Sequence, residues 1–467
     1  IMEAHISHVP LIALTTDRPE ELQEIGAPQT VNQANMYGDN TKAFSALQMQ
    51  DEHADVTAYI DYHVQQLVVT ATTAPAGPVQ INLPLRKPLM PDLGETWPTV
   101  TEQVITVGTM RANEATVATL ANKLRDEKAL LLVGPDETGW QAEKFATLAE
   151  HFQMPMLADV LSNVRPSDAA INGIDALLEA GALDDTLVPD VAVRFGGTPV
   201  SARVVAWLRD KQVQVIQVGV NHAGHDHSRQ TTITLAVDEM ALVDDLLATD
   251  GRTENDYLTQ WQTVKQALAT AIATTEMSEV ALPGVMAAVP ADSQLFIANS
   301  MPIRDMDNYF MPAANVHVMA NRGANGIDGT VSSAFGMAMT GKPTTFLTGD
   351  LTLFHDMNGL MMAHQANLAM TIVVVNNNGG GIFSFLPQAA AKDYFEPMFG
   401  TPLALSVEKI AALYDADYHL ATSQDDLRDL LAHPATTLRL IEVKSTRAQN
   451  VAEHDAVLVK IREAFNG

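Results

Sequence analysis

The sequence contains no cysteine among its 467 residues, and this absence excludes several kinds of site. Disulfides, zinc–thiolate centres and iron–sulfur clusters all need cysteine, so none of them can form within this chain. Basic residues are also few: 28 Lys and Arg stand against 56 Asp and Glu, which gives a formal net charge of −28. Nucleic acids and anionic membranes are bound by basic surfaces, so we expect neither as a partner.

Long apolar runs are missing as well. The longest, residues 360–375, is interrupted by His364, Gln365 and Asn367 and is too short and too polar to span a bilayer. The absence of cysteine fits a cytoplasmic location, which we expect for this chain. The chain opens with Ile1 and runs almost at once into a strand pattern, so we expect that an N-terminal segment is missing from this sequence.

Short apolar runs alternate with helical patterns along the chain. The runs that we interpret as buried parallel strands are residues 9–16, 79–85, 129–135, 191–197, 213–220, 294–300, 316–323, 344–350, 371–377 and 438–444. Such runs separated by helices are typical of βαβ units, so the sequence predicts an α/β fold of three doubly wound parallel-sheet domains. We place these domains at residues 1–95, 96–275 and 276–467, with a proline-rich linker at the first boundary.

The polar residues of segment 346–387 indicate a functional site. One predicted strand ends at Asp350 and the next ends at Asn377, which is followed by the glycines of residues 379–381. The ends of consecutive parallel strands lie on one edge of a sheet, so Asp350 and Asn377 can converge. A carboxylate, an amide oxygen and a nearby backbone carbonyl suit a hard divalent cation such as Mg²⁺.

The same segment is suited to a bulky anion. The glycines let the backbone come close to such an anion, and we expect a helix that begins near Asp356 to offer it amide donors. The sequence therefore predicts a site for Mg²⁺ and a diphosphate. The alternative is that Asp350 only caps the helix and the glycines form a tight turn; either feature alone favours this alternative, whereas the combination favours the site.

Longer motifs surround these residues. They are TTDRPEELQEIGAPQT (15–30), NSMPIRD (299–305), NRGANGIDGTVSSAFG (321–336), GDLTLFHDMNGL (349–360), NNNGGGIFSFLP (376–387) and FGTP (399–402). Together they resemble the 2-succinyl-5-enolpyruvyl-6-hydroxy-3-cyclohexene-1-carboxylate (SEPHCHC) synthases of menaquinone biosynthesis, a branch of the thiamine diphosphate enzymes. The resemblance spans nearly the whole chain, is weakest in the middle domain, and includes Leu351 where the broader superfamily has a third glycine.

This resemblance implies a fold and an activity. Such enzymes have pyruvate oxidase-like α/β domains, here the C-terminal part of a pyrimidine-binding domain, a central domain and a diphosphate-binding domain. They are transferases that use thiamine diphosphate with Mg²⁺ or Mn²⁺ to decarboxylate 2-oxoglutarate and to add the resulting carbanion to isochorismate. Their cofactor sites lie between subunits, so a homodimer or homotetramer is implied.

The resemblance also assigns roles to individual residues. The metal ligands would be Asp350, Asn377 and the Gly379 carbonyl. The cofactor would contact Ile327, Gly349, Asp350, Leu351, Thr352, Asn377, Gly379, Gly380, Ile382, Phe383 and Leu386. Both substrates carry two carboxylates, which planar guanidinium groups bind in a bidentate manner. The substrate residues would be Arg18, Arg304 and Arg322, with Ser300 and Gln29 as hydrogen-bonding groups.

Two departures from the family pattern leave questions open. The glutamate that activates the cofactor in this family precedes the region where this chain starts, and no glutamate here, including Glu3, matches its motif. Many members of the family carry a lysine after the PVS segment, where this chain has Ala202 followed by Arg203. Whether Arg203 substitutes for that lysine is not decided by the sequence.

Other functions remain possible alternatives. The chain could be another thiamine diphosphate carboligase, similar to acetolactate synthase, or an inactive cofactor-binding fragment. A P-loop is rejected for residues 336–343 (GMAMTGKP), because this segment runs from a helix to a strand and lacks the metal-binding hydroxyl. His222, His225 and His227 could bind zinc, but no acidic general base is spaced with them, and we interpret them as solvated loop residues.

Overall fold

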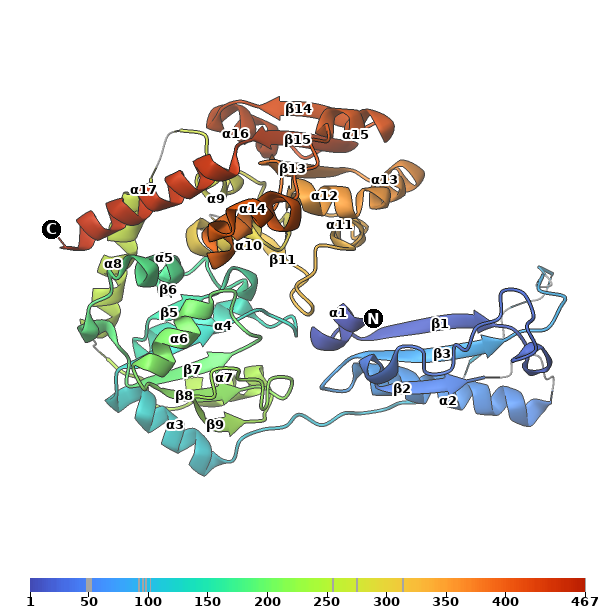
Figure 1. Ribbon diagram of the computed structural model, residues 1–467. Coiled ribbons are helices and arrows are strands. Elements are labelled where there is room, and N and C mark those ends of the chain that lie inside the picture. The colour runs from blue at the N-terminus through green and yellow to red at the C-terminus, as the bar shows by residue number, and fades with distance from the viewer. Residues whose placement is uncertain are drawn as a thin grey trace. The chain divides into compact units, whose positions relative to one another are not determined.

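The computed structural model describes residues 1–47, 53–90, 93–94, 96, 99–100, 102–253, 256–273, 276–312 and 315–466. The chain forms two compact units, Ile1–Thr109 with Arg322–Ala324, and Met110–Asn321 with Asn325–Gly467 (Figure 1). Three parallel sheets with helices are present, which confirms the predicted α/β class. Residues 95 and 275, where two of the expected domains end, lie outside the described residues, and the three domain boundaries remain a prediction.

The first unit contains a three-stranded parallel sheet in the order β1-β3-β2. Its strands are β1 (Leu11–Asp17), β2 (Ala43–Ala46) and β3 (Pro78–Pro84), and its helical segments are α1 (Met2–Ile6), η1 (Glu20–Leu22), η2 (Gly38–Asn40) and α2 (Ala54–Thr72). Helix α2 packs Leu67 and Ala71 against Val79 and Ile81 of the central strand β3. The short strand β2 was not predicted from the sequence.

The second unit begins with a six-stranded parallel sheet in the order β6-β5-β4-β7-β8-β9. These strands are β4 (Ala129–Val133), β5 (Met156–Ala158), β6 (Ala170–Ile171), β7 (Val191–Phe195), β8 (Gln214–Val218) and β9 (Thr231–Leu235). The 3-10 segments η3 (Val160–Ser162) and η4 (Asp185–Leu187) lie between them. The strand pattern that was predicted at β4, β7 and β8 is therefore present, with three short strands added to it.

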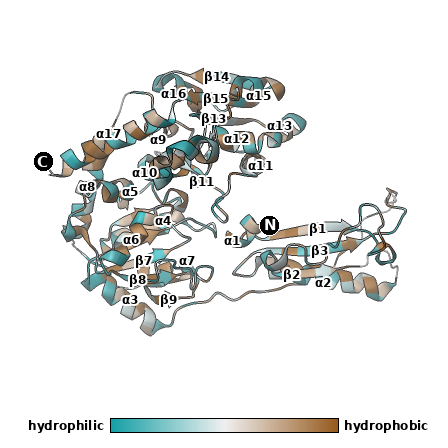
Figure 2. Cartoon of the chain, in the orientation of Figure 1, coloured by the Kyte–Doolittle hydropathy of each residue, from teal (hydrophilic) through white to brown (hydrophobic). Residues whose placement is uncertain are grey.

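Helices cover both faces of this sheet. Alternate residues of β4 enter two different cores, as expected for a strand buried on both sides. One core contains α3 (Glu114–Asp126), α4 (Ala142–Phe152) and α7 (Glu239–Leu247); the other contains α5 (Ile174–Ala180), α6 (Ala202–Asp210), α8 (Asp256–Ile272) and the C-terminal helix α17 (Arg447–Asn466). Figure 2 shows apolar and polar residues interspersed along α17, which buries Val457 and Ile461 in this core.

A second six-stranded parallel sheet has the order β11-β10-β12-β13-β15-β14. Its strands are β10 (Gln294–Ile297), β11 (His317–Met319), β12 (Thr344–Gly349), β13 (Met370–Asn376), β14 (Asp417–Ala421) and β15 (Leu438–Lys444). Helices α9 (Leu282–Met286), α10 (Met301–Tyr309) and α16 (Gln424–Ala432) share one core, and α11 (Thr330–Ala338), α12 (Asp350–His355), α13 (Leu360–Ala366) and α15 (Val407–Leu413) share the other.

Short helical turns connect this sheet. They are η5 (Met357–Gly359), η6 (Gly381–Phe385), η7 (Pro387–Ala390), α14 (Lys392–Phe395) and η8 (Glu396–Gly400). Four of them follow β13 directly and hold several of the predicted site residues. None of the helices in the described part of the chain is long and apolar enough to cross a membrane.

Candidate functional site

Two neighbouring strands of the second large sheet end beside each other. Gly349 of β12 is paired with Val375 of β13, so Asp350 and Asn377 follow adjacent strands at one edge. The Asp350 side chain is buried, and its two oxygens accept hydrogen bonds from the backbone N–H of Leu351 at 2.8 Å and of Gly379 at 2.9 Å. Burial raises the pKa of Asp350, and the backbone hydrogen bonds oppose this shift.

The Asn377 side chain is oriented by Glu279. Its Nδ2 donates to Glu279 Oε1 at 3.1 Å and to Oε2 at 3.4 Å. The Asn377 Oδ1 is buried and has no hydrogen-bond partner among the described residues. A buried oxygen without a donor is costly unless something occupies its lone pairs, so Asp350 and Asn377 fit a hard divalent cation.

The first helix after β12 begins at Asp350, six residues before the expected start near Asp356, where the 3-10 segment η5 begins instead. Gly349 is the N-cap, and an acidic first-turn residue such as Asp350 is favourable at a helix N-terminus. Asp356 instead ends α12, and its carboxylate accepts the backbone N–H of Ser332 in α11 at 2.8 Å. The 3-10 segment η5 begins at Met357, directly after Asp356.

The glycines after Asn377 are required by a close backbone neighbour. The backbone N–H of Gly380 donates to the Gly400 carbonyl at 2.8 Å. A Cβ on Gly379 would lie 2.1 Å from that carbonyl oxygen, and one on Gly380 would lie 2.3 Å from the Phe399 oxygen. Gly379 also has a φ of +141°, which favours glycine. We expected these glycines to approach an anion, whereas in the structure the backbone of residues 399–400 occupies that place.

The remaining predicted cofactor residues surround these strand ends. Thr352 is buried in α12 and Leu351 beside it is half-buried. Ile327 is half-buried ahead of α11, and its carbonyl accepts the Thr330 hydroxyl at 3.1 Å. Ile382 and Phe383 are half-buried in η6, and Leu386 follows with 39% of its surface exposed.

A cavity of about 240 Å³ lies within the second unit and contains two arginines. Arg304 of α10 and Arg203 of α6 both line it, together with Ile382, Phe385 and Leu386. The same lining contains four acidic residues, Asp175, Glu179, Asp305 and Asp455. Arg203 is held by Asp175 at 2.5 Å and by Glu179 at 3.0 Å. The structure thus places Arg203, whose role the sequence left open, in one cavity with Arg304.

Helix α10 starts from an unusual backbone conformation at Ser300. This residue has φ 75° and ψ −131°, and its carbonyl accepts Arg304 Nη1 at 2.5 Å. Non-glycine residues at positive φ are uncommon, persist only where the surroundings hold them, and cluster at functional sites.

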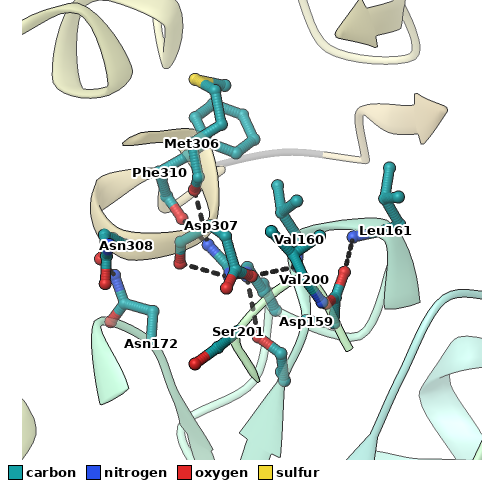
Figure 3. Close-up of polar contacts among 12 residues, drawn as sticks. Asp159, Val160, Leu161, Asn172, Val200, Ser201, Met306, Asp307, Asn308 and Phe310 are labelled. Atoms are coloured by element: carbon teal, nitrogen blue, oxygen red, sulfur yellow. Dashed lines mark hydrogen bonds and ion pairs between the residues drawn. The ribbon is translucent and has the colours of Figure 1, made fainter. Parts of the chain in front are cut away.

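An ion pair buried in the second unit holds α10. Arg165 Nη2 lies 2.7 Å from Asp307 Oδ1, and Arg165 also donates to the carbonyls of Met306 and Phe310. Asp307 Oδ1 additionally accepts the backbone N–H of Val160 at 2.9 Å (Figure 3). Burial raises the pKa of Asp307 and Arg165 opposes this shift. This clamp attaches α10, and with it Ser300 and Arg304, to the segment after β5.

Three of the predicted substrate residues lie in the first unit. Arg18 directly follows β1 and is half-buried, and Gln29 is exposed with φ 59°. Arg322 is half-buried in the segment Arg322–Ala324, which belongs to the same unit. The second unit brings together Ser300 and Arg304, as well as Asp350, Asn377 and Gly379.

The residues that support the site carry no recognisable pattern in the sequence. Glu279 was assigned to a domain boundary, yet it is buried and accepts hydrogen bonds from Asn377, Ser445 and Asn450. Burial raises the pKa of Glu279 to about 7, and the bonds from Ser445 and Asn377 lower it. No local pattern marks Glu279, because its partners lie far away along the sequence.

One residue of the histidine cluster differs from expectation, whereas His225 and His227 are exposed as expected. His222 is buried instead of solvated, and its Nε2 lies 3.8 Å from Glu137 Oε2 and 4.0 Å from Glu239 Oε1. Burial raises the pKa of Glu239 to about 7. Asp226 of the loop after β8 lies 3.8 Å from Arg194 Nη1 of β7.

Comparisons with known proteins agree with this geometry. Residues 92–297 match the family "Middle domain of thiamine pyrophosphate", and residues 299–443 match "Thiamine pyrophosphate enzyme, C-terminal TPP binding domain". The 2-succinyl-5-enolpyruvyl-6-hydroxy-3-cyclohexene-1-carboxylate synthase of Leuconostoc mesenteroides is 43% identical over 463 residues, covering 99% of this chain and 83% of that protein. The synthase of the same name from Listeria monocytogenes serotype 4b is 37% identical and covers 100% of this chain and 84% of its own length.

A solved structure shares the fold. The benzoylformate decarboxylase from Polynucleobacter necessarius superposes with a TM-score of 0.69, covering 96% of this chain and 84% of that one. Its sequence identity of 17% supports a common fold only.

Proposed function

Because the chain belongs to the SEPHCHC synthase family of thiamine diphosphate enzymes, we propose that it is the transferase of menaquinone biosynthesis that converts 2-oxoglutarate and isochorismate into SEPHCHC and CO₂. The observation that carries the cofactor assignment is the buried edge where Asp350 and the unpartnered Asn377 Oδ1 follow adjacent strands. The names of the relatives carry the choice of substrates.

Bound thiamine diphosphate would supply the electron sink for decarboxylation. Asp350, Asn377 and the Gly379 carbonyl would hold Mg²⁺ or Mn²⁺; that carbonyl accepts one hydrogen bond, from Gly381 at 3.0 Å, and has a second lone pair. The residues that would contact the cofactor are Gly349, Leu351, Thr352, Gly380, Ile327, Ile382, Phe383 and Leu386. Their backbone and apolar groups suit the exclusion of water from the reacting carbon.

Arg304 of the cavity would bind a substrate carboxylate, with Arg203, which is already paired with Asp175 and Glu179, beside it. A chain with a net charge of −28 repels dicarboxylates over most of its surface, so local guanidinium groups must provide the attraction. Arg304 and Arg203 line a cavity with Ile382 and Leu386, where bidentate contacts would orient a dicarboxylate beside the cofactor. Arg18, Arg322, Ser300 and Gln29 complete the proposed substrate set. We also propose a homodimer or homotetramer and, from the lack of cysteine, a cytoplasmic location.

The decisive experiment titrates the chain with thiamine diphosphate and Mg²⁺ and then measures CO₂ release from 2-oxoglutarate with isochorismate. We expect Mg²⁺-dependent cofactor binding and CO₂ release from 2-oxoglutarate. Turnover of pyruvate but not of 2-oxoglutarate would instead favour an acetolactate synthase-like carboligase. Cofactor binding without any decarboxylation would favour an inactive cofactor-binding protein.

A further inference from the structure

We propose that Glu279 is a positioning residue that turns the Asn377 side-chain oxygen toward the metal ion. This role rests on the proposed function, because it requires Asn377 to be a metal ligand. Glu279 lies just before α9 in a segment that no sequence motif marks, and it is 3% exposed. Its partners come from three different elements of the diphosphate-binding region.

Among the described residues, the hydrogen bonds of the Glu279 side chain all have its carboxyl oxygens as acceptors. Oε1 accepts the Asn377 amide at 3.1 Å and the Ser445 hydroxyl, and Oε2 accepts the Asn450 amide at 2.8 Å. Ser445 follows β15, and Asn450 lies in the first turns of α17. Ser445 and Asn450 therefore fix the position of the Glu279 carboxyl group independently of Asn377.

The two ends of an asparagine amide have nearly the same shape but opposite polarity. Both oxygens of the Glu279 carboxyl group accept hydrogen bonds, so Glu279 selects the NH₂ end of Asn377 and leaves Oδ1 facing away from it. The opposite orientation would place an NH₂ group at the cation, which cannot coordinate it. Outer groups that orient a metal ligand in this way contribute to metal affinity without touching the metal.

The neighbouring asparagine provides a matched control. Asn376 donates through its Nδ2 to Glu442 Oε1 at 2.6 Å, and Glu442 in β15 is 2% exposed. Glu442 and Glu279 are thus both buried glutamates that hold an asparagine amide at the end of β13. Only Asn377 is a proposed metal ligand, so the two glutamates differ in the role that we assign.

The experiment compares Glu279→Gln with Glu442→Gln. The Glu279→Gln side chain replaces one acceptor oxygen by an NH₂ group, which faces the amide donors of Asn377 and Asn450. The Asn377 amide then loses its fixed orientation. We expect the apparent Mg²⁺ affinity at saturating thiamine diphosphate, measured by titration calorimetry, to fall about 10–100-fold for Glu279→Gln and by less than about threefold for Glu442→Gln. Thermal unfolding of the cofactor-free variants should show losses of similar size. Equal Mg²⁺ affinities for the two variants would overturn the role of Glu279.

A complementary exchange tests whether Glu279 acts through Asn377. The single Asn377→Asp variant places two carboxyl groups beside each other. In the double variant Glu279→Gln/Asn377→Asp, residue 279 supplies the donor and residue 377 the acceptor, which reverses the polarity of the original hydrogen bond. We expect the double variant to bind Mg²⁺ more tightly than the two single effects added together would allow. Simple additivity would contradict the proposal.

Two further results keep the proposal separate from folding and from the proposed function. If Glu279→Gln does not fold, Ser445→Ala removes one donor to Glu279, and we expect about a three- to tenfold loss of Mg²⁺ affinity. An unchanged affinity in that folded variant would count against Glu279. If the unaltered chain takes up no Mg²⁺ with thiamine diphosphate, the proposed function and this role fail together; if it does, only the role of Glu279 is at stake in the variants.

Discussion

The second unit contains two buried acidic clusters whose charges are compensated differently. Asp307 faces the guanidinium of Arg165 at 2.7 Å, so its cation belongs to the protein. Among the described residues, the hydrogen-bond donors to Glu279 are neutral side chains, and those to Asp350 are backbone N–H groups. The charge of His454 also acts on Glu279, whereas Asp350 accepts only backbone N–H groups among the described residues. Asp307, which has its own cation, serves structure, and Asp350 is arranged for a cation from solution.

The largest expected effect concerns Asp350, the buried carboxylate without a cation of the protein beside it. Asp350→Ala removes a carboxylate that has no cation of its own, and we expect it to abolish Mg²⁺-dependent binding of thiamine diphosphate. Unfolding of the cofactor-free protein should change little, because the buried charge is lost together with its desolvation cost. Titration calorimetry and thermal unfolding measure the two quantities. Full cofactor affinity in this variant would remove Asp350 from the site.

Removing the cation of the Arg165–Asp307 pair should lower the stability of the fold instead. Arg165→Met leaves Asp307 buried without its cation, and we expect a loss of about 3–5 kcal/mol in the free energy of unfolding. Urea unfolding of the cofactor-free protein at pH 7 measures this loss. The double variant Arg165→Met/Asp307→Leu should recover much of it, since no unpaired charge then remains. A loss below about 1 kcal/mol would show that the pair is not a clamp.

A third buried acidic group, Asp305, is paired with a cation that can lose its proton, His454. His454 Nε2 lies 2.8 Å from Asp305 Oδ1; burial opposes the imidazolium charge, but Asp305 outweighs burial and raises the pKa of His454 to about 9. The pair therefore stabilises the fold fully below about pH 6.5, and its contribution of up to about 3 kcal/mol is lost as the pH rises through 9.

The measurement is urea unfolding at pH 6 and pH 9.5, for the unaltered chain and for His454→Gln. The unaltered chain should lose more stability between these two pH values than the variant loses. The Arg165–Asp307 pair should show no such loss over this interval, because arginine keeps its charge. Equal pH dependence in both proteins would mean that His454 is not charged in the fold.

The smallest expected effect comes from Arg304, which lines the cavity but takes no part in the Arg165–Asp307 ion pair. Arg304→Ala removes a cavity arginine from α10 without touching Arg165, so stability should be nearly unchanged. We expect the KM for 2-oxoglutarate to rise by about 1.5–3 kcal/mol in free-energy terms, the size of one lost charge-assisted contact. Arg304→Lys should recover only part of this loss, since lysine lacks the planar fork. An unchanged KM would exclude Arg304 from the substrate cavity.

Much of the fold could be predicted because buried parallel strands are apolar and continuous. The runs at β4, β7, β12, β13 and β15 were identified for this reason. Strands β2, β5, β6, β9 and β14 were missed, since they are short or polar and lie at or next to sheet edges. The helix start was placed late because sequence alone did not show that Asp350 itself is the first helical residue.

The site was predictable where topology alone brings residues together. Asp350 and Asn377 end adjacent parallel strands, so their proximity follows from the strand order. Glu279 could not be predicted in the same way, because its contact with Asn377 depends on how a loop before α9 packs under the sheet edge. Hydrogen bonds between distant buried polar groups leave no periodic pattern in a sequence.

The hydrogen bond between Gly380 and Gly400 allows the segment between them to vary among such enzymes. The Gly380 N–H donates to the Gly400 carbonyl, so residues 380–400 form a closed loop whose two ends meet. The cavity residues Ile382 and Leu386 lie inside this loop, whereas Asp350 and Asn377 lie outside it. Mutation can therefore lengthen, shorten or exchange the loop while its ends stay together. Natural selection can reshape the substrate cavity in this way and inherit the cation site unchanged.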